Sequence, residues 1–389
     1  MIHPTFLDWN LHNKRVFLRA DLNVPLMQGK IDNDFRLTSI LPTINALLDK
    51  GAEIVLTTHI GRPDNQDPEL STQHLIPWFK KHGYHITFVP DYTAIKQYPI
   101  QPHHILLLEN LRFFPGEKDA DPFFAKQLAN GAHYYVNDAF GLIHEHDCSV
   151  SVLPYEFPEN RRSIGLLIEK ELTKLDILKH NPQHPFIAIL GGGKIEDKTP
   201  LIQQLLPKVD TLLICPALCF SFLKAMGKPV GKSLVNDAMI PACKQIILQA
   251  EKLGVNYIFP SDYQIAYDSV DGSLDIVNAE EFPENAVGIS IGPKTIEQFS
   301  TEINKARTIF FNCAMGFADK PATITSTQKL IHAMAQSHAT TIIAGGDSVD
   351  IAFETPGHQS ITHLSTGGGA ALAYLSDALL PGLLPFEEK

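Results

Sequence analysis

Short apolar runs of strand length alternate along this chain with segments whose apolar residues recur every three to four positions. In the first part of the chain the strand-length runs are Val16–Arg19, Glu53–Thr57, His85–Val89, Ile105–Leu108 and Tyr134–Val136. Residues 38–50, which are followed by Gly51, carry the helical repeat between two of these runs. Such alternation is typical of parallel sheets with helices packed on their faces, because each parallel crossover needs a long connection.

The same alternation begins again in the second half of the chain. Its strand-length runs are Phe186–Leu190, Thr211–Cys215, Tyr257–Pro260, Thr308–Phe311, Thr341–Ala344 and Ile361–Leu364, with helical segments such as 241–253 and 326–336. A charged amphipathic segment separates the two series, and we expect it to form an interdomain helix over 165–181. Because 389 residues are too many for one ordinary core, we predict an α/β protein with two doubly wound parallel-sheet domains.

Charge and cysteine content exclude several classes of protein. The formal net charge of −11 argues against a nucleic-acid-binding protein, which needs a broad basic surface to displace counterions. The five cysteines form no Cys-x-x-Cys, so neither a disulfide framework nor a zinc knuckle is indicated. The chain shows no signal-peptide pattern and no uninterrupted apolar stretch of membrane-spanning length. We therefore expect a cytoplasmic protein that binds neither nucleic acid nor a membrane.

Basic and polar side chains follow the first-half strands where each strand ends. In chain order they are Asp21, Asn23, Arg36 (just before a helix), His59, Arg62 and Arg112. The carboxyl ends of parallel strands meet at one edge of a sheet, so we expect these side chains on the same side. A lone arginine usually pairs with a surface carboxylate, but arginines at successive loops favour binding of a small anion that carries phosphate and carboxylate groups.

Glycine takes the place of arginine at the strand ends of the second half. Gly191, Gly192 and Gly193 follow one strand-length run, and Lys194 and Lys198 lie four residues apart at the expected start of a helix. Backbone N–H groups at such a helix start attract phosphate, and the two lysines add positive charge. Taken alone, this segment fits a plain strand-to-helix turn with solvated lysines equally well.

Two further glycine-rich loops follow strands in the second half. They are Gly345-Gly346-Asp347-Ser348 and Ser365-Thr366-Gly367-Gly368-Gly369. We expect their backbone N–H groups to cradle nucleotide phosphates. Asp347 is a natural Mg²⁺ ligand, because magnesium takes one or two carboxylates together with phosphate oxygens. A helix N-cap is the alternative role for Asp347, and the two roles are compatible.

Two other patterns indicate no site of their own. His144-Glu145-His146-Asp147 looks like a set of metal ligands, but adjacent side chains cannot all face one ion, so we interpret it as a polar loop. Cys215 and Cys219 have no activating neighbour in the sequence and are expected in the core. The chain also lacks a Gly-x-Gly-x-x-Gly after its first strand and a P-loop pattern, which disfavours an NAD-dependent dehydrogenase.

Seven motifs, taken in order through nearly the whole chain, resemble those of phosphoglycerate kinases. They are RADLNVP at 19–25, HIGRP at 59–63, ENLRF at 109–113, NDAFG at 137–141, GGGKIEDK at 191–198, GGDS at 345–348 and STGGG at 365–369. The resemblance implies two Rossmann-like domains joined by the interdomain helix and a hinge. The N-terminal domain, 1–164, would bind 3-phosphoglycerate, and the C-terminal domain, 182–379, would bind Mg²⁺ with ATP or ADP. The tail, 380–389, is expected to pack back on the first domain.

The resemblance also implies an activity and residue roles. The expected enzyme is a monomeric glycolytic kinase that moves a phosphoryl group reversibly between 1,3-bisphosphoglycerate with ADP and 3-phosphoglycerate with ATP. The residues expected to hold phosphoglycerate are Asp21, Asn23, Arg36, His59, Arg62 and Arg112. Those expected to hold the nucleotide and the transferred group are Lys194, Lys198, Gly345, Gly346, Asp347 and Ser348, with Asp347 on the metal. Arg36, Lys194 and Lys198 would be catalytic, because transfer to an ionised carboxylate needs alignment and charge neutralisation rather than a base.

Several positions depart from the family pattern. Glu145 stands where the family has a substrate-binding arginine, so either the loop is reorganised or binding is weaker. Asp319 is the nearest match to the acidic residue that holds the ribose, and Pro216 and Ala217 replace a pair of glycines beside the adenine. Two hypotheses follow: an active phosphoglycerate kinase with a modified nucleotide pocket, or a non-catalytic paralogue that serves as a binding protein.

Overall fold

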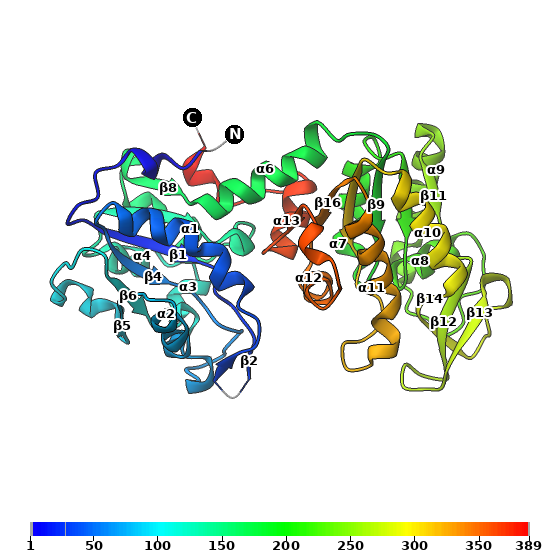
Figure 1. Cartoon of the computed structure of the whole chain (residues 1–389), viewed down its shortest axis with the longest axis horizontal. Coiled ribbons are helices and arrows are strands. Elements are labelled where there is room, and N and C mark those ends of the chain that lie inside the picture. The colour runs from blue at the N-terminus through cyan, green and yellow to red at the C-terminus, as the bar shows by residue number, and fades with distance from the viewer. Residues whose placement is uncertain (1–2, 28, 388–389) are drawn as a thin grey trace. The chain divides into compact units, whose positions relative to one another are not determined.

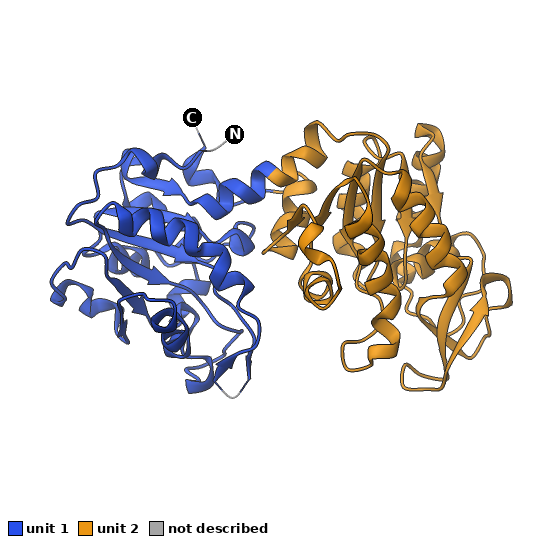
Figure 2. Ribbon diagram, viewed as in Figure 1, with its two compact units in different colours: residues 1–173, 379–389 blue, residues 174–378 orange. Residues whose placement is uncertain are grey.

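The computed structural model describes residues 3–27 and 29–387 and divides into two compact units (Figure 2). Unit 1 comprises residues 1–173 and 379–389, and unit 2 comprises residues 174–378. The division falls inside one continuous helix, α6 (Leu166–His180). The last two residues of the predicted tail, 388–389, lie outside the described residues.

A six-stranded sheet with all strands parallel forms the centre of unit 1 (Figure 1). Its strand order is β5-β6-β4-β1-β7-β8. The strands are β1 (Arg15–Ala20), β4 (Glu53–Thr57), β5 (Ile86–Val89), β6 (Ile105–Leu108), β7 (Tyr134–Asp138) and β8 (Arg162–Ile164). The helices are α1 (Phe35–Asp49), α2 (Ile76–Lys81), α3 (Pro115–Lys118), α4 (Pro122–Ala129) and α5 (Cys148–Ser151).

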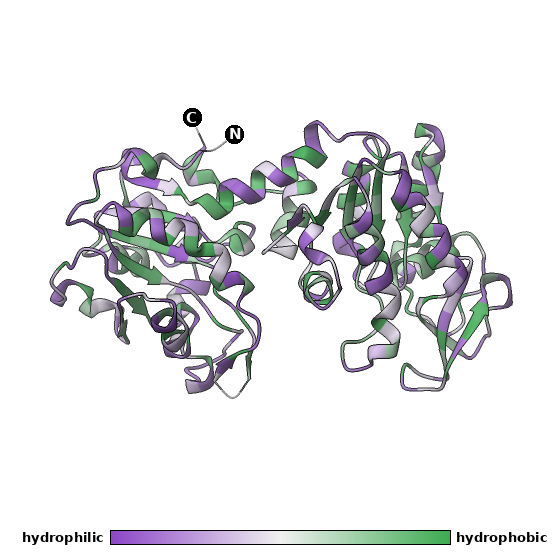
Figure 3. Cartoon of the chain, viewed as in Figure 1, coloured by the Kyte–Doolittle hydropathy of each residue, from purple (hydrophilic) through white to green (hydrophobic). Residues whose placement is uncertain are grey.

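The two faces of this sheet bury alternate residues of each strand against different helices. Val16 and Leu18 of β1 pack in one cluster with apolar residues of α1, whereas Phe17 packs in another with apolar residues of α4. Successive side chains of a strand point to opposite faces, and both faces are covered here, so the strands read as continuous apolar runs. Figure 3 shows these central strands as largely hydrophobic.

Unit 2 repeats this architecture with its own six-stranded parallel sheet, in the order β11-β10-β9-β15-β16-β17. Its strands are β9 (Phe186–Leu190), β10 (Thr211–Ile214), β11 (Asn256–Ile258), β15 (Thr308–Asn312), β16 (Thr340–Ile343) and β17 (His363–Leu364). Its helices are α7 (Ile195–Leu205), α8 (Leu218–Ala225), α9 (Ile240–Leu253), α10 (Pro293–Lys305), α11 (Pro321–Gln336), α12 (Gly346–Phe353) and α13 (Gly368–Leu375). The predicted fold class, α/β with two parallel sheets, is confirmed.

The structure also contains elements that the apolar pattern did not predict. An antiparallel sheet of β12 (Asp262–Tyr267), β13 (Leu274–Asn278) and β14 (Ala286–Ile291) belongs to unit 2, and β2 (Leu26–Met27) pairs with β3 (Lys30–Ile31) in unit 1. Most of β13 is exposed, so it lacks the apolar run that marks the buried strands. Among the described residues, none of the helices has both the length and the apolar character needed to cross a bilayer.

The end of the chain packs against unit 1. Asn137 Nδ2 donates a hydrogen bond to the Gly382 carbonyl at 3.0 Å, and the Gly382 N–H donates to the Ile143 carbonyl at 2.9 Å. Further along, the Phe386 ring stacks on Tyr135 with ring centroids 6.3 Å apart. The residues after 378 thus supply both hydrogen bonds and apolar surface to unit 1.

The buried carboxyl group of Asp138, at the carboxyl end of β7, holds the start of α6. It accepts hydrogen bonds from the Ile168 N–H at 2.9 Å and from Thr43 Oγ1 at 2.5 Å, and Thr43 Oγ1 in turn accepts from the Leu166 N–H at 3.0 Å. A Cβ at Gly165 would lie 2.2 Å from the Asp138 carboxyl carbon, so only glycine fits there. Burial raises the pKa of Asp138 to about 7, despite the hydrogen bonds that favour its ionised form.

This raised pKa predicts that the stability of unit 1 falls as the pH rises from about 4 to about 7. The folded protein binds a proton at Asp138 more tightly than the unfolded chain, whose pKa is near 3.8, so ionisation of Asp138 opposes folding. We expect Asp138→Asn to remove up to roughly 4 kcal/mol of this pH dependence while keeping the hydrogen-bond acceptor. Urea unfolding at several pH values measures this pH dependence. Tryptophan fluorescence reports the unfolding of unit 1, because both tryptophans, Trp9 and Trp78, belong to that unit. A variant with the pH profile of the wild type would contradict this role.

Candidate functional site

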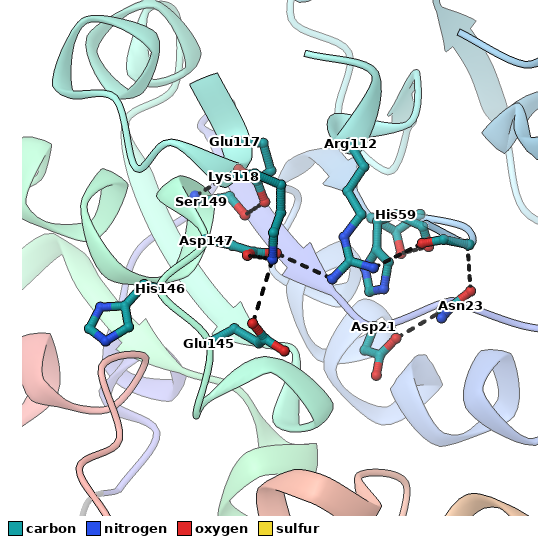
Figure 4. Close-up of polar contacts among 12 residues, drawn as sticks. Asp21, Asn23, His59, Arg112, Glu117, Lys118, Glu145, His146, Asp147 and Ser149 are labelled. Atoms are coloured by element: carbon teal, nitrogen blue, oxygen red, sulfur yellow. Dashed lines mark hydrogen bonds and ion pairs between the residues drawn. The ribbon is translucent and has the colours of Figure 1, made fainter. Parts of the chain in front are cut away.

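The loops that follow β1, β4 and β6 lie together at one edge of the unit 1 sheet, because these strands are parallel neighbours. Asn23 Oδ1 accepts a hydrogen bond from the Gly61 N–H at 2.8 Å, and Arg112 Nη1 donates to the Gly61 carbonyl at 2.8 Å (Figure 4). Gly61 has a positive φ of 66°, which suits glycine. Three predicted loops are thus joined through the backbone of Gly61.

Arg36 lies in the first turn of α1 rather than just before a helix, because α1 begins at Phe35. Its Nη1 donates to both carboxylate oxygens of Asp21, at 2.6 and 2.7 Å. Asp21 is buried, whereas 28% of the Arg36 side chain is exposed. Asp21 therefore orients Arg36 and leaves part of its guanidinium group accessible.

Arg112 and Arg62 retain donors for a ligand. Arg112 is largely buried, and its Nη2 lies 3.5 Å from Asp147 Oδ2. Its Nε is buried and finds no acceptor among the residues that the structure describes. Arg62 is exposed, and no described residue forms a hydrogen bond or ion pair with it. An anion bound at this edge would meet both sets of unused donors.

His59 is buried among these cations. Its Nδ1 lies 3.5 Å from Arg19 Nη2. Burial holds the pKa of His59 well below its usual range, and nearby positive charges lower it further. These charges belong to Arg19, Arg112, Arg36 and Lys118. His59 is therefore neutral at physiological pH, and it offers a ligand one N–H donor without adding charge.

Beside the loop that carries Glu145 lies a cation that the sequence motifs did not reveal. Lys118 Nζ lies 2.6 Å from Asp147 Oδ1 and 3.5 Å from Glu145 Oε2 (Figure 4). The available signal was the position of Lys118, six residues beyond Arg112, at the end of the short helix α3 that follows β6. Within the described parts of the chain, no group of three or more His, Cys, Asp or Glu side chains is arranged to hold a metal ion.

In unit 2, the loop from β9 to α7 is tightly packed against its neighbours. The Gly191 N–H donates to the Asn312 carbonyl and the Gly192 N–H to the Pro216 carbonyl, both at 3.1 Å. A Cβ at Gly191 would lie 2.4 Å from Cys313 Sγ, and Gly192 has a positive φ of 94°. The glycines at these two positions are therefore required by close contact and by backbone conformation.

The two lysines of this loop have different surroundings. Lys198 is buried in α7, and its Nζ donates to Asn312 Oδ1 at the end of β15, while Asn312 Nδ2 donates to the Ala344 carbonyl at 2.7 Å. Burial lowers the pKa of Lys198, and the nearby Cys313 and Asp197 oppose this shift. Lys194 occupies the N-cap position of α7 and is exposed. Lys198 is thus fixed between strand ends, whereas Lys194 reaches solvent.

The loop after β16 places a carboxylate at the start of a helix. Gly345 is the N-cap of α12, with a positive φ of 108°, so the alternative interpretation of Asp347 as the N-cap is wrong. Asp347 lies in the first turn and is exposed, without a polar partner among the described residues, while Ser348 is buried. A Cβ at Gly368 would lie 2.7 Å from the Gly345 Cα, so the two glycine-rich loops are in close contact.

The remaining predicted positions of unit 2 divide into buried and exposed groups. Cys215 and Cys219 are buried, as expected for core residues, and burial raises the pKa of both thiols well above the usual value. Pro216 is also buried and Ala217 half-buried, beside the Gly191–Gly193 loop. Asp319 is exposed in the turn between Phe317 and Lys320.

Comparison with known proteins matches nearly the whole chain. A family model described as phosphoglycerate kinase matches residues 6–378. The chain is 39% identical over 386 residues to a phosphoglycerate kinase from Bdellovibrio bacteriovorus (97% of this chain, 96% of that protein) and 36% identical over 399 residues to one from Finegoldia magna (100% of each). Among solved structures, phosphoglycerate kinase from Coxiella burnetii aligns with a TM-score of 0.83 at 30% identity, covering 97% of both chains. That from Pyrococcus horikoshii OT3 aligns with a TM-score of 0.84 at 28% identity and the same coverage.

Proposed function

The chain belongs to the phosphoglycerate kinase family, and we propose that unit 1 holds phosphoglycerate while unit 2 holds the nucleotide and the transferred phosphoryl group. As a phosphoglycerate kinase, the protein is a phosphotransferase of glycolysis that uses phosphoglycerate and ATP or ADP as small-molecule substrates. Neither the relatives nor the site geometry favours the alternative of a binding protein without turnover.

The proposed phosphoglycerate site rests on the donors at the edge of the unit 1 sheet. Arg36 keeps part of its guanidinium group accessible, Arg62 is exposed, and Arg112 has a buried Nε without an acceptor among the described residues. Neutral His59 adds an N–H donor, and Asp21 and Asn23 hold the loops in place. This set of donors suits an anion with a phosphate at one end and a carboxylate at the other.

The proposed nucleotide site rests on the glycine-rich helix starts of unit 2. Backbone N–H groups near Gly345 and Gly346 begin α12, and Lys194 and Lys198 add positive charge at the start of α7. Asp347 is suited to bind Mg²⁺, because it is an exposed carboxylate beside these N–H groups and forms no hydrogen bond or ion pair with a described residue. Asp319 is proposed to bind the nucleotide ribose, because it is the nearest match to the acidic residue that holds the ribose in the family pattern.

Mg²⁺ bound at Asp347 would neutralise charge on the nucleotide phosphates and hold them in place. The acceptor carboxylate of phosphoglycerate is already ionised, so no residue has to remove a proton. Arg36 and Lys198 are proposed to contact the transferred group and stabilise its developing charge, with Lys194 contributing from the helix start. The fixed position of Lys198 means that little reorganisation is needed when the transfer occurs.

The observation that carries this division of roles is the contrast between the two sheet edges, arginines in unit 1 and glycine-rich helix starts in unit 2. A coupled assay for 1,3-bisphosphoglycerate, together with calorimetry of ADP and GDP with and without Mg²⁺, tests it. We expect turnover with Mg²⁺ and ATP, and we expect Asp347→Asn to weaken ADP binding only when Mg²⁺ is present. Absence of turnover with both ATP and GTP, from folded protein with Mg²⁺, would reject the catalytic function. Equal weakening with and without the metal would reject the role of Asp347.

A further inference from the structure

We propose that Lys118 is a substrate-binding residue that supplies the positive charge missing at Glu145. This inference rests on the proposed phosphoglycerate site in unit 1. Its basis is the contact of Lys118 Nζ with Asp147 Oδ1 at 2.6 Å and with Glu145 Oε2 at 3.5 Å. Lys118 thereby becomes part of the edge at which Arg112 lies (Figure 4).

A buried network fixes the backbone that carries Lys118. The preceding residue, Glu117, is fully buried in α3, and its carboxylate accepts hydrogen bonds from the Ser149 N–H at 2.9 Å and from Ser149 Oγ at 2.5 Å. Arg19 Nη2 lies 3.5 Å from the same carboxylate. Because Ser149 belongs to α5, this network ties α3 to α5, the helix that directly follows Asp147. The backbone positions of Lys118 and Asp147 are therefore fixed by buried hydrogen bonds between α3 and α5.

Asp147 connects Lys118 to Arg112. It is buried, with Lys118 Nζ on one carboxylate oxygen and Arg112 Nη2, at 3.5 Å, on the other. The positive charges of Lys118, Arg112 and Arg36 also act together on His59. These contacts place the ammonium group of Lys118 among the cations of the proposed site.

Lys118 places a positive charge next to the negative charge of Glu145. A carboxylate facing an anionic substrate would repel it, and Lys118 is a cation that lies within 4 Å of Glu145. About half of the Lys118 side chain is exposed, so Lys118 reaches solvent at this edge although its ammonium group is paired with Asp147. Beside it, Arg112 Nε is a buried donor without an acceptor among the described residues. The edge therefore has an unused donor next to the Lys118 ammonium.

Steady-state kinetics of charge variants test this inference. We expect Lys118→Ala to raise KM for 3-phosphoglycerate about tenfold, with KM for ATP unchanged, because one charge-assisted contact is lost and Glu145 is left unbalanced. Lys118→Glu should raise KM for 3-phosphoglycerate further, and the increase should shrink at high salt. In Lys118→Ala with Glu145→Gln, where both charges are gone, the increase should be smaller than in Lys118→Ala alone.

The matched control is Lys126→Ala, which removes an exposed lysine of α4 elsewhere in unit 1 and should leave both KM values unchanged. An unchanged KM for 3-phosphoglycerate in Lys118→Ala, with or without a lower Tm, would reduce Lys118 to a structural partner of Asp147 and overturn the proposal. Equal increases in both KM values would overturn it as well. Calorimetry of 3-phosphoglycerate with wild type and Lys118→Ala measures the same effect without turnover, so an inactive wild type would count against the catalytic function alone.

Discussion

Lys198→Ala is expected to lower kcat by about a hundredfold to a thousandfold while KM for 3-phosphoglycerate changes little. Lys198 is buried, and its ammonium group is held by Asn312 at the end of β15, so it presents a fixed positive charge at the proposed phosphate site. A charge that is already in position stabilises the transferred group without reorganisation, and alanine removes this contribution completely. Steady-state kinetics with both substrates varied separate the two constants.

Two variants serve as comparisons for Lys198→Ala. Lys244→Ala removes an exposed lysine of α9 in the same unit and should leave kcat at the wild-type value. Arg62→Ala, in the proposed phosphoglycerate site, should raise KM for 3-phosphoglycerate more than it lowers kcat. If Lys198→Ala and Arg62→Ala changed both constants in the same proportion, the separate roles assigned to them would be wrong.

Gly191→Ala is expected to lower the free energy of unfolding of unit 2 by about 3 kcal/mol. Where this loss leaves unit 2 unfolded, nucleotide binding is lost with it. The new Cβ would lie 2.4 Å from Cys313 Sγ and 2.9 Å from the Pro216 carbonyl oxygen. Cys313 is buried and the Pro216 carbonyl is a backbone group bonded to Gly192, so neither can move without disturbing the sheet edge. Urea unfolding followed by far-UV circular dichroism measures the loss.

The design of this experiment uses the distribution of tryptophan. Both tryptophans lie in unit 1, so fluorescence follows that unit, whereas circular dichroism follows both. Gly191→Ala should move the circular dichroism transition to lower urea and leave the fluorescence transition in place. Gly346→Ala is the control for stability, because its Cβ would meet nothing within 4 Å, and it should change the free energy of unfolding by less than about 0.5 kcal/mol. Equal effects of the two substitutions would show that close packing at Gly191 is unimportant.

The elements best predicted from the sequence are those whose burial is complete. Strands such as β4 and β9 are buried along their whole length, so an apolar run marks them closely. The antiparallel strand β13 is mostly exposed, and its residues carry no such run. The helix α1 begins at Phe35, earlier than the apolar repeat over 38–50 indicates, because its first turn also contains Arg36, a charged residue that pairs with Asp21.

At the candidate site, motifs predicted the loops but not the contacts within them. Position after a strand was enough to indicate Arg112 and Lys198, because parallel strands bring their carboxyl ends together. The role of Asp147 in joining Arg112 to Lys118 depends on the packing of α3 against α5, which Glu117 and Ser149 create across more than thirty positions of sequence. A single sequence does not show which distant residues meet in this way. Charge at one position, such as Glu145, therefore says little until its neighbours in space are known.

The return of residues 379–389 to unit 1 has a consequence for synthesis on the ribosome. Unit 2 is a continuous stretch, residues 174–378, and all of it has been synthesised before residues 379–389 are added. Unit 1 lacks the Gly382 hydrogen bonds and the Phe386 ring until these residues have been synthesised. The unit that is begun first is therefore completed after unit 2, and a chain truncated after residue 378 would contain all of unit 2 beside an incomplete unit 1.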